Sequence, residues 1–234
     1  MGIEIKSRTY ISIQHIQSAA CFTRLAYQME ESHDGIYSQD FFTQHRAYVT
    51  SAIFTAVAFL EASINELFCD SVDQTTVAHD RIFKQLDSKT IKLFSSHWSR
   101  GIPRTAKYSI IEKYQIALEL AEKELFKKGQ SPCQDVHFLV QLRNALIHYE
   151  PEWVVGYSEF NENIKEHTLE SALKARFKIN KATGAGNPYY PDQLLGHGCA
   201  EWGTINSIKF VDDFCSRLGV NSRFDHVRGN LSTK

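Results

Sequence analysis

Apolar residues recur at helical spacing along most of the chain and predict a succession of amphipathic helices. Between residues 39 and 69 a single apolar stripe consists of Val49, Ile53, Val57, Leu60, Ile64 and Leu67. Steps of three and four residues place such a set on one face of an α-helix, and that face is expected to turn toward the core. We therefore expect a long core helix from about Gln39 to Cys69.

The same periodicity predicts helices on both sides of this segment. They are expected over residues 10–31, as one or two short helices within 77–94, from Pro103 to about Lys128, from about Gln134 to Tyr149, and from about Cys199 to Leu218. Farther along, two interpretations stay open: a helix at 162–177, or a short strand near 153–157. Because no alternation of strand and helix patterns occurs, the predicted fold class is all-α.

Glycine and proline residues suggest how the chain is organised. The segment 181–198 contains four glycines and two prolines, and a loop of this length inside a domain is usually functional or mobile. We expect a single helical domain over residues 1–234. Its peripheral parts are a helical extension at 1–38, this long loop, and a polar tail at 222–234.

Composition and charge narrow the class of protein. The chain is 43% hydrophobic and 23% charged with a net charge of −1, which is typical of a soluble globular protein. This balance excludes a non-specific nucleic-acid coat protein, although a local basic cleft remains compatible with it. The apolar run from Ala52 to Leu60 ends at Glu61 and is too short to cross a bilayer. Five widely spaced cysteines without a CxxC pair fit reduced thiols, so we expect a cytoplasmic protein with no membrane association.

Three polar residues stand out on the helix predicted for 134–149. Arg143, Asn144 and His148 flank its apolar face, and Pro151 ends the segment. The apolar face consists of Phe138, Leu142, Ala145, Leu146 and Tyr149. Asn144 and His148 are four residues apart and share one stripe, while Arg143 lies on the other side of the apolar face. Taken alone, these residues also have an ordinary structural interpretation. A histidine near the end of a helix is favoured by the helix dipole, and a mid-helix arginine usually pairs with a carboxylate.

Three stretches of the sequence resemble the HEPN superfamily of all-helical proteins. LRNALIHY (142–149) matches its signature, an arginine followed by a polar residue and, a few residues later, a histidine. AVAFLEASINELF (56–68) resembles the second core helix of that family, which carries an acidic or polar residue facing the site. Glu61 occupies that place, and Asn65 lies one turn farther on. CAEWGTINSIKFVDDF (199–214) is similar to the closing helix.

The resemblance covers about residues 45–218 and implies a HEPN-like helical bundle with long core helices and a C-terminal packing helix. It also implies a metal-independent endoribonuclease that acts as a homodimer in a toxin or anti-phage system, with an antitoxin or another defence protein as partner. Other members are catalytically silent and serve as dimerisation, nucleotide-sensing or RNA-binding modules, and this alternative stays open. In one toxin subgroup a partner enzyme modifies a tyrosine two residues after the histidine, where this chain has Glu150.

The implied reaction explains why these residue types would share one helix. Moving protons to and from the 2′-hydroxyl and the leaving 5′-oxygen suits a histidine such as His148. The planar fork of Arg143 suits a phosphate, and Asn144 would hold the imidazole or donate to a phosphate oxygen. Glu61 has two open roles, orienting Arg143 or His148, or pairing with a cation for structural reasons. Since in-line displacement needs groups on both sides of phosphorus, a two-fold dimer would supply the second histidine.

Further substrate contacts are expected outside the signature. Between residues 81 and 107 the positive side chains outnumber the negative ones; they are Arg81, Lys84, Lys89, Lys92, Arg100, Arg104 and Lys107. With Phe94, Trp98 and Tyr108 interleaved, this stretch either guides a single RNA strand or forms an ordinary solvated face. We expect Asn65, Tyr149, Arg104 and Lys107 to bind substrate. No set of residues has the spacing of a metal site, so no metal or cofactor is expected.

Overall fold

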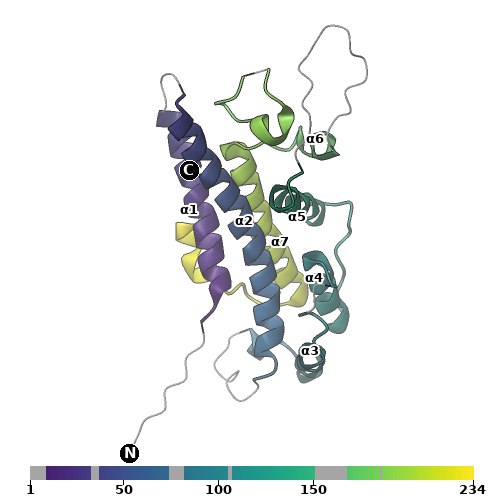
Figure 1. The fold of residues 1–234 in the computed structure, drawn as a ribbon. Coiled ribbons are helices and arrows are strands. Elements are labelled where there is room, and N and C mark those ends of the chain that lie inside the picture. Colours follow the sequence, from purple (N-terminus) through teal and green to yellow (C-terminus); the bar gives the residue numbers. More distant parts are fainter. Residues whose placement is uncertain (1–8, 33–36, 74–81, 105–106, 151–167, 185) are drawn as a thin grey trace, which may run out of the picture.

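The computed structural model describes the chain except for residues 1–8, 33–36, 74–81, 105–106, 151–167 and 185 (Figure 1). All regular secondary structure in the described part is helical, which confirms the all-α class. The helices are α1 (Ile11–Ser32), α2 (Gln39–Asp70), α3 (Ser88–Ser99), α4 (Ile110–Leu120), α5 (Cys133–Ile147), α6 (Thr168–Leu173) and α7 (His197–Leu218). Three short helical turns accompany them: η2 (Phe83–Gln85), η3 (Tyr189–Gln193) and η4 (Asp225–Asn230).

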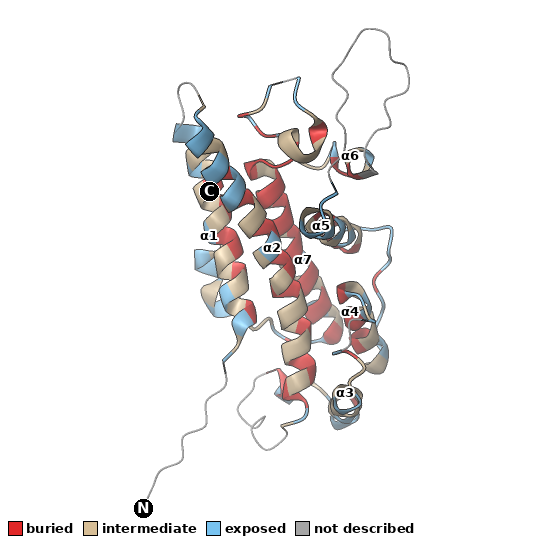
Figure 2. Cartoon of the chain, viewed as in Figure 1, coloured by how far each residue is buried: buried red, intermediate tan, exposed pale blue. Residues whose placement is uncertain are grey.

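The three long helices α1, α2 and α7 lie side by side and form the body of the protein (Figure 1). The shorter helices α3, α4 and α5 cover one side of this bundle. Figure 2 shows the buried residues concentrated on the faces that these helices turn toward one another, with α7 buried along much of its length. One contiguous hydrophobic core therefore joins all the long elements.

Helix α2 follows the apolar pattern of its sequence closely. Ser38 caps its first turn by accepting a hydrogen bond from the backbone N–H of Phe41 at 3.1 Å. By length and hydropathy, α2 is the one described helix that could cross a membrane. Its apolar stripe packs against α1, α5 and α7, as expected of a core helix in a globular protein.

The helix predicted from Pro103 to Lys128 is wrong at both ends. Pro103 lies in a turn, and α4 begins only after Ser109, whose side chain and Glu112 form a reciprocal capping box. The helix ends at Leu120, and Glu122 then adopts a positive φ of 54°. The start of this helix is determined by the Ser-x-x-Glu capping signal at Ser109, six residues after Pro103.

The segment 222–234, expected as a polar tail, contains the helical turn η4 and contacts the bundle through particular residues. Phe224 is only 2% exposed, and its ring lies 5.3 Å from that of Phe59 in an edge-to-face arrangement. Arg24 of α1 donates to the backbone carbonyl of Ser232 at 2.6 Å. A single buried aromatic residue among polar neighbours fixes this segment, which a count of polar residues misses.

Other predictions in this region need smaller corrections. The long loop expected at 181–198 contains the helical turn η3, and α7 begins inside it at His197. The short helices expected within 77–94 correspond to η2 and α3, and the latter continues to Ser99. Within 162–177 the described helix is α6, while the strand considered near 153–157 lies outside the described residues.

Close backbone approaches fix the start of α7. A Cβ atom at Gly198 would overlap the backbone carbonyl of Lys178, and one at Gly196 would lie 2.6 Å from Cα of Asn180. Farther along α7, a Cβ atom at Gly203 would lie 2.9 Å from a methyl group of Leu139 in α5. Glycine at these positions therefore allows α5 and the segment before α7 to pack directly against the α7 backbone.

We predict that Gly198→Ala lowers the free energy of unfolding by about 1–3 kcal/mol, because the obstructing atom belongs to the backbone and has no other rotamer. Chemical denaturation followed by circular dichroism measures the change. Gly129→Ala is the matched control, since nothing lies within 4 Å of its added Cβ. Equal stability of the two variants would contradict the packing described here.

Candidate functional site

Helix α5 carries the three signature residues, and its core face is largely as predicted. Val136, Leu139 and Leu142 are fully buried, while Phe138, Ala145 and Leu146 are partly buried against the core. Tyr149 departs from the prediction, because it is 49% exposed. The physical reason is that α5 ends at Ile147, so Tyr149 no longer follows the helical spacing.

Arg176, which follows α6, holds α5 in place. Its guanidinium pairs with Asp135 in the first turn of α5 and lies 4.6 Å from the ring centre of Phe138. Its Nε donates to the carbonyl of Ala172 at 2.8 Å, which ties the contact to the end of α6. The rotation of α5 about its axis, and hence the direction of its polar residues, is thus fixed from outside the helix.

Asn144 and His148 lie in the exposed last turn of α5. His148 is the C-terminal cap, and its backbone N–H donates to the carbonyl of Asn144 at 2.8 Å. Within the described part of the chain, no hydrogen bond joins the side chains of Arg143, Asn144 and His148. Among the described residues the side chain of His148 is exposed and makes no hydrogen bond.

Arg143 lies half-buried on the same helix and makes no ion pair to any residue that the structure describes. Its Nε atom is buried and has no hydrogen-bond partner there. The ordinary alternative, a mid-helix arginine paired with a carboxylate, therefore has no support among the described residues. A buried guanidinium donor normally requires an acceptor, so this atom marks a place where an anion would be favourable.

An aromatic contact links the end of α5 to the segment before α7. The rings of Tyr149 and Tyr190 lie 6.3 Å apart at an angle of 40°. Ile147, on the other side of His148, is 52% exposed. His148 is therefore bordered by two exposed apolar side chains.

Glu61 and Asn65 both contact Lys113 of α4, which is not among the predicted site residues. Lys113 forms an ion pair with Glu61 and donates to Asn65 at 3.4 Å, while the amide of Asn65 donates to Glu61 at 3.3 Å. Of the two roles left open for Glu61, the structure contains the structural ion pair. It places no contact between Glu61 or Asn65 and the signature residues among the described interactions.

The burial of Lys113, although not its partner, could have been inferred from the sequence. The buried residues of α4 are Ile110, Lys113, Tyr114, Ala117 and Leu118, an apolar stripe with one lysine in it. Lys113 is only 4% exposed, so it requires a carboxylate partner nearby. Glu61 on α2 is that partner.

The basic stretch is divided between surface and core. Arg104 and Lys107 are exposed, and the Arg104 guanidinium lies 5.1 Å from the ring centre of Trp98. Phe94, in contrast, is buried and packs 5.1 Å from Phe68, so it is unavailable for base stacking. The Trp98–Arg104 pair is the part of this stretch that could meet a single strand.

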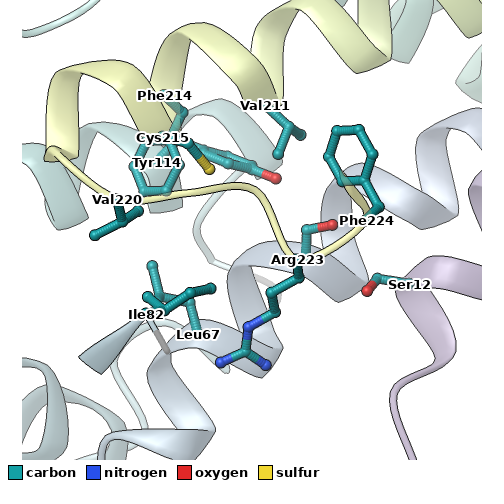
Figure 3. A pocket seen from close by; sticks show the side chains of 11 residues that line it. Ser12, Leu67, Ile82, Tyr114, Val211, Phe214, Cys215, Val220, Arg223 and Phe224 are labelled. Atoms are coloured by element: carbon teal, nitrogen blue, oxygen red, sulfur yellow. The ribbon is translucent and has the colours of Figure 1, made fainter. Parts of the chain in front are cut away.

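An apolar cavity of about 40 Å³ lies between α2, α4, α7 and the segment after α7 (Figure 3). Burial raises the pKa of Cys215, one of its lining residues, to about 11, so this thiol stays protonated at neutral pH. Burial also raises the pKa of the Tyr114 hydroxyl, which donates to the carbonyl of Leu60 at 2.8 Å. Neither group is suited to nucleophilic or proton-transfer chemistry.

Comparison of the chain with protein-family models, curated proteins and solved structures found no match. The candidate site is accordingly defined by its own residues. They are Arg143, which has no ion pair among the described residues, and Asn144 and His148, which are exposed one turn apart.

We predict that Glu61→Gln lowers the free energy of unfolding by about 1–3 kcal/mol, because it leaves the buried Lys113 ammonium without a charged partner. The figure is reduced from that of a fully buried pair because Glu61 is partly exposed. The double variant with Lys113→Met should recover most of the loss in urea denaturation. A variant of unchanged stability that loses function would instead assign Glu61 to the site.

Proposed function

We propose that this protein is a cytoplasmic, metal-independent endoribonuclease of the HEPN type. It cleaves RNA through the 2′-hydroxyl at a site shared by the two chains of a homodimer, and it acts as a toxin or an anti-phage effector. The observation that carries the proposal is Arg143, a half-buried guanidinium with one donor that no described residue satisfies. A substrate phosphate is the kind of acceptor that matches it.

The roles of the neighbouring residues follow from their exposure and spacing. His148 is exposed at the end of α5 and transfers the proton of the 2′-hydroxyl or of the leaving 5′-oxygen. Asn144 lies one turn before it and donates to a non-bridging oxygen or holds the imidazole. Arg143 stabilises the charge that develops on the phosphoryl oxygens.

A second copy of the chain completes the site in this proposal. One histidine per chain serves only one side of an in-line displacement, whereas a two-fold axis near His148 brings in a second. The exposed side chains of Ile147 and Tyr149 border His148, and a partner surface would cover them. Their position favours an interface at the end of α5.

RNA outside the scissile bond would meet the Trp98–Arg104 pair and Lys107. An exposed arginine over an indole ring offers both a phosphate contact and a stacking surface. This assignment makes Arg104 and Lys107 binding residues that add to affinity without entering the reaction.

One observation favours a second candidate function, a catalytically silent module of the same type that dimerises, binds RNA or senses nucleotides. Lys113 forms an ion pair with Glu61 and a hydrogen bond with Asn65. Neither Glu61 nor Asn65 makes a described contact with Arg143 or His148. An active site that needed an acidic residue to orient its histidine would lack it here. Incubation of the purified protein with total RNA separates the two candidates.

We predict that His148→Ala and Arg143→Ala each abolish RNA cleavage, with a loss of roughly a hundredfold or more in rate. Arg143→Lys should restore little activity, because a point charge lacks the planar fork. Both alanine variants should keep the thermal midpoint and the dimeric mass of the unchanged protein, since neither residue forms the apolar face. Lost stability with intact cleavage in the folded fraction would reject the assignment.

We also predict that cleavage survives EDTA, because the proposed chemistry uses only protein side chains and the substrate's own 2′-hydroxyl. The products should carry 2′,3′-cyclic phosphate ends, and DNA of the same sequence should stay intact. Mass spectrometry of the fragments measures the end groups directly. Strict magnesium dependence or cleavage of a deoxyribose strand would overturn the mechanism.

A further inference from the structure

A hollow of about 630 Å³ with a mixed polar and apolar lining lies between the first half of α2 and the segment that joins α6 to α7. The residues that matter for its chemistry are Gln39, Phe42, Arg46, Thr183, Asn187 and Asp192. In Figure 1 this segment is drawn in light green, at the end of the bundle where α2 begins. The hollow is distinct from the apolar cavity of Figure 3.

Several side chains of the hollow have hydrogen-bonding capacity that the protein leaves unused. The side-chain amides of Gln39 and Asn187 make no hydrogen bond to any residue in the described ranges. The Thr183 hydroxyl donates to the carbonyl of Asn180 at 2.9 Å, so its oxygen can still accept. This set of donors and acceptors fits the edge of a nucleobase better than an apolar molecule, which would leave the polar groups without partners.

Arg46 is the positive side chain of the hollow. It donates to the Asp192 carboxylate at 2.5 Å and is 48% exposed on its side chain. A guanidinium has five N–H donors, and this contact uses one of its nitrogen atoms, which leaves others to meet a phosphate. Asp192 is the single acidic residue among those that line the hollow, so a divalent cation would find too few ligands.

The segment on the far side of the hollow is held in a defined position by Asn180. Its side chain accepts from the N–H of Ala182 at 3.0 Å and donates to the carbonyl of Leu195 at 3.1 Å. Tyr190, two residues from Asp192, contacts Tyr149 beside His148. Two residues of extended chain span at most roughly 7 Å, so Asp192 in the hollow lies within about that distance, along the backbone, of the residue that contacts Tyr149.

We propose that this hollow binds one nucleotide unit. The phosphate of the nucleotide contacts Arg46 and its base packs along the Phe42 ring. The side-chain amides of Gln39 and Asn187 contact the edge of the base. For an RNA strand this inference rests on the proposed function, since the unit then lies next to the bond cleaved at His148. A free nucleotide presents the same chemistry, and the experiment separates the two sources.

The experiment measures binding in the His148→Ala variant, so that RNA is not consumed. The probes are each of the common ribonucleoside 5′-monophosphates, by calorimetry, and a short fluorescent single-stranded RNA, by anisotropy. Arg46→Ala should weaken binding roughly tenfold by removing a charge-assisted contact. Asp192→Asn should tighten it roughly two- to fivefold, because it releases Arg46 and removes a negative charge near the phosphate.

The opposite signs of these two changes exclude a merely structural effect, which would weaken binding in both variants. Lys209→Ala is the matched control, since it removes one exposed positive charge from α7 and should change neither affinity. Nucleotide binding that depends on Arg46 in a protein that never cleaves RNA would support the hollow and reject the ribonuclease. RNA cleavage with both probes insensitive to Arg46, or no binding of either probe, would overturn the hollow.

Discussion

The crossing of α5 over α7 determines where the three signature residues Arg143, Asn144 and His148 lie. At Gly203 the α7 backbone comes close enough to Leu139 that an added Cβ would lie 2.9 Å from the leucine methyl group. The buried face of α5 fixes the opposite, polar face, and Arg176 locks the rotation by pairing with Asp135. A shift of α5 by one residue would turn Arg143 and His148 about 100° away from their present directions.

The burial of the Arg143 Nε atom is the structural observation behind the proposed phosphate contact. A guanidinium nitrogen that loses water without gaining a hydrogen bond costs free energy, and among the described residues the Nε of Arg143 has no partner. Lys113 offers a comparison within the same chain, since it is more deeply buried and has both Glu61 and Asn65 as partners. The fold thus satisfies a purely structural buried cation, and Arg143 has no such provision among the described residues.

The sequence predicts the long helices well because their boundaries follow from burial. The helices expected at 10–31 and 39–69 occupy Ile11–Ser32 and Gln39–Asp70, a shift of one residue at three of the four ends. Short elements follow local signals or distant contacts instead. The start of α4 depends on the Ser109–Glu112 capping box, and the C-terminal segment depends on Phe224 reaching Phe59. Periodicity carries no information about either.

In the candidate site too, local features could be predicted from the sequence, whereas contacts between helices could not. The order of Arg143, Asn144 and His148 on one helix is a local property, so it could be predicted. The partner of Glu61 could not, because the choice between Arg143, His148 and Lys113 depends on how α4 packs against α2. The contact of Tyr190 with Tyr149 likewise depends on the path of the segment before α7.

Electrostatics connects the proposed dimer to its substrate. A two-fold axis near His148 would bring two Arg143 side chains toward one cleft, and like charges 4 Å apart repel by roughly 1 kcal/mol in water and about 4 kcal/mol near a protein surface. A phosphate between them replaces this repulsion with two favourable contacts, so dimerisation and RNA binding would strengthen each other. The dissociation constant of the dimer should therefore be lower with single-stranded RNA than without it. In the Arg143→Ala variant this difference between the two conditions should be smaller. Sedimentation equilibrium with and without RNA measures both effects, and a dimer equally stable in all cases would argue that Arg143 lies away from the axis.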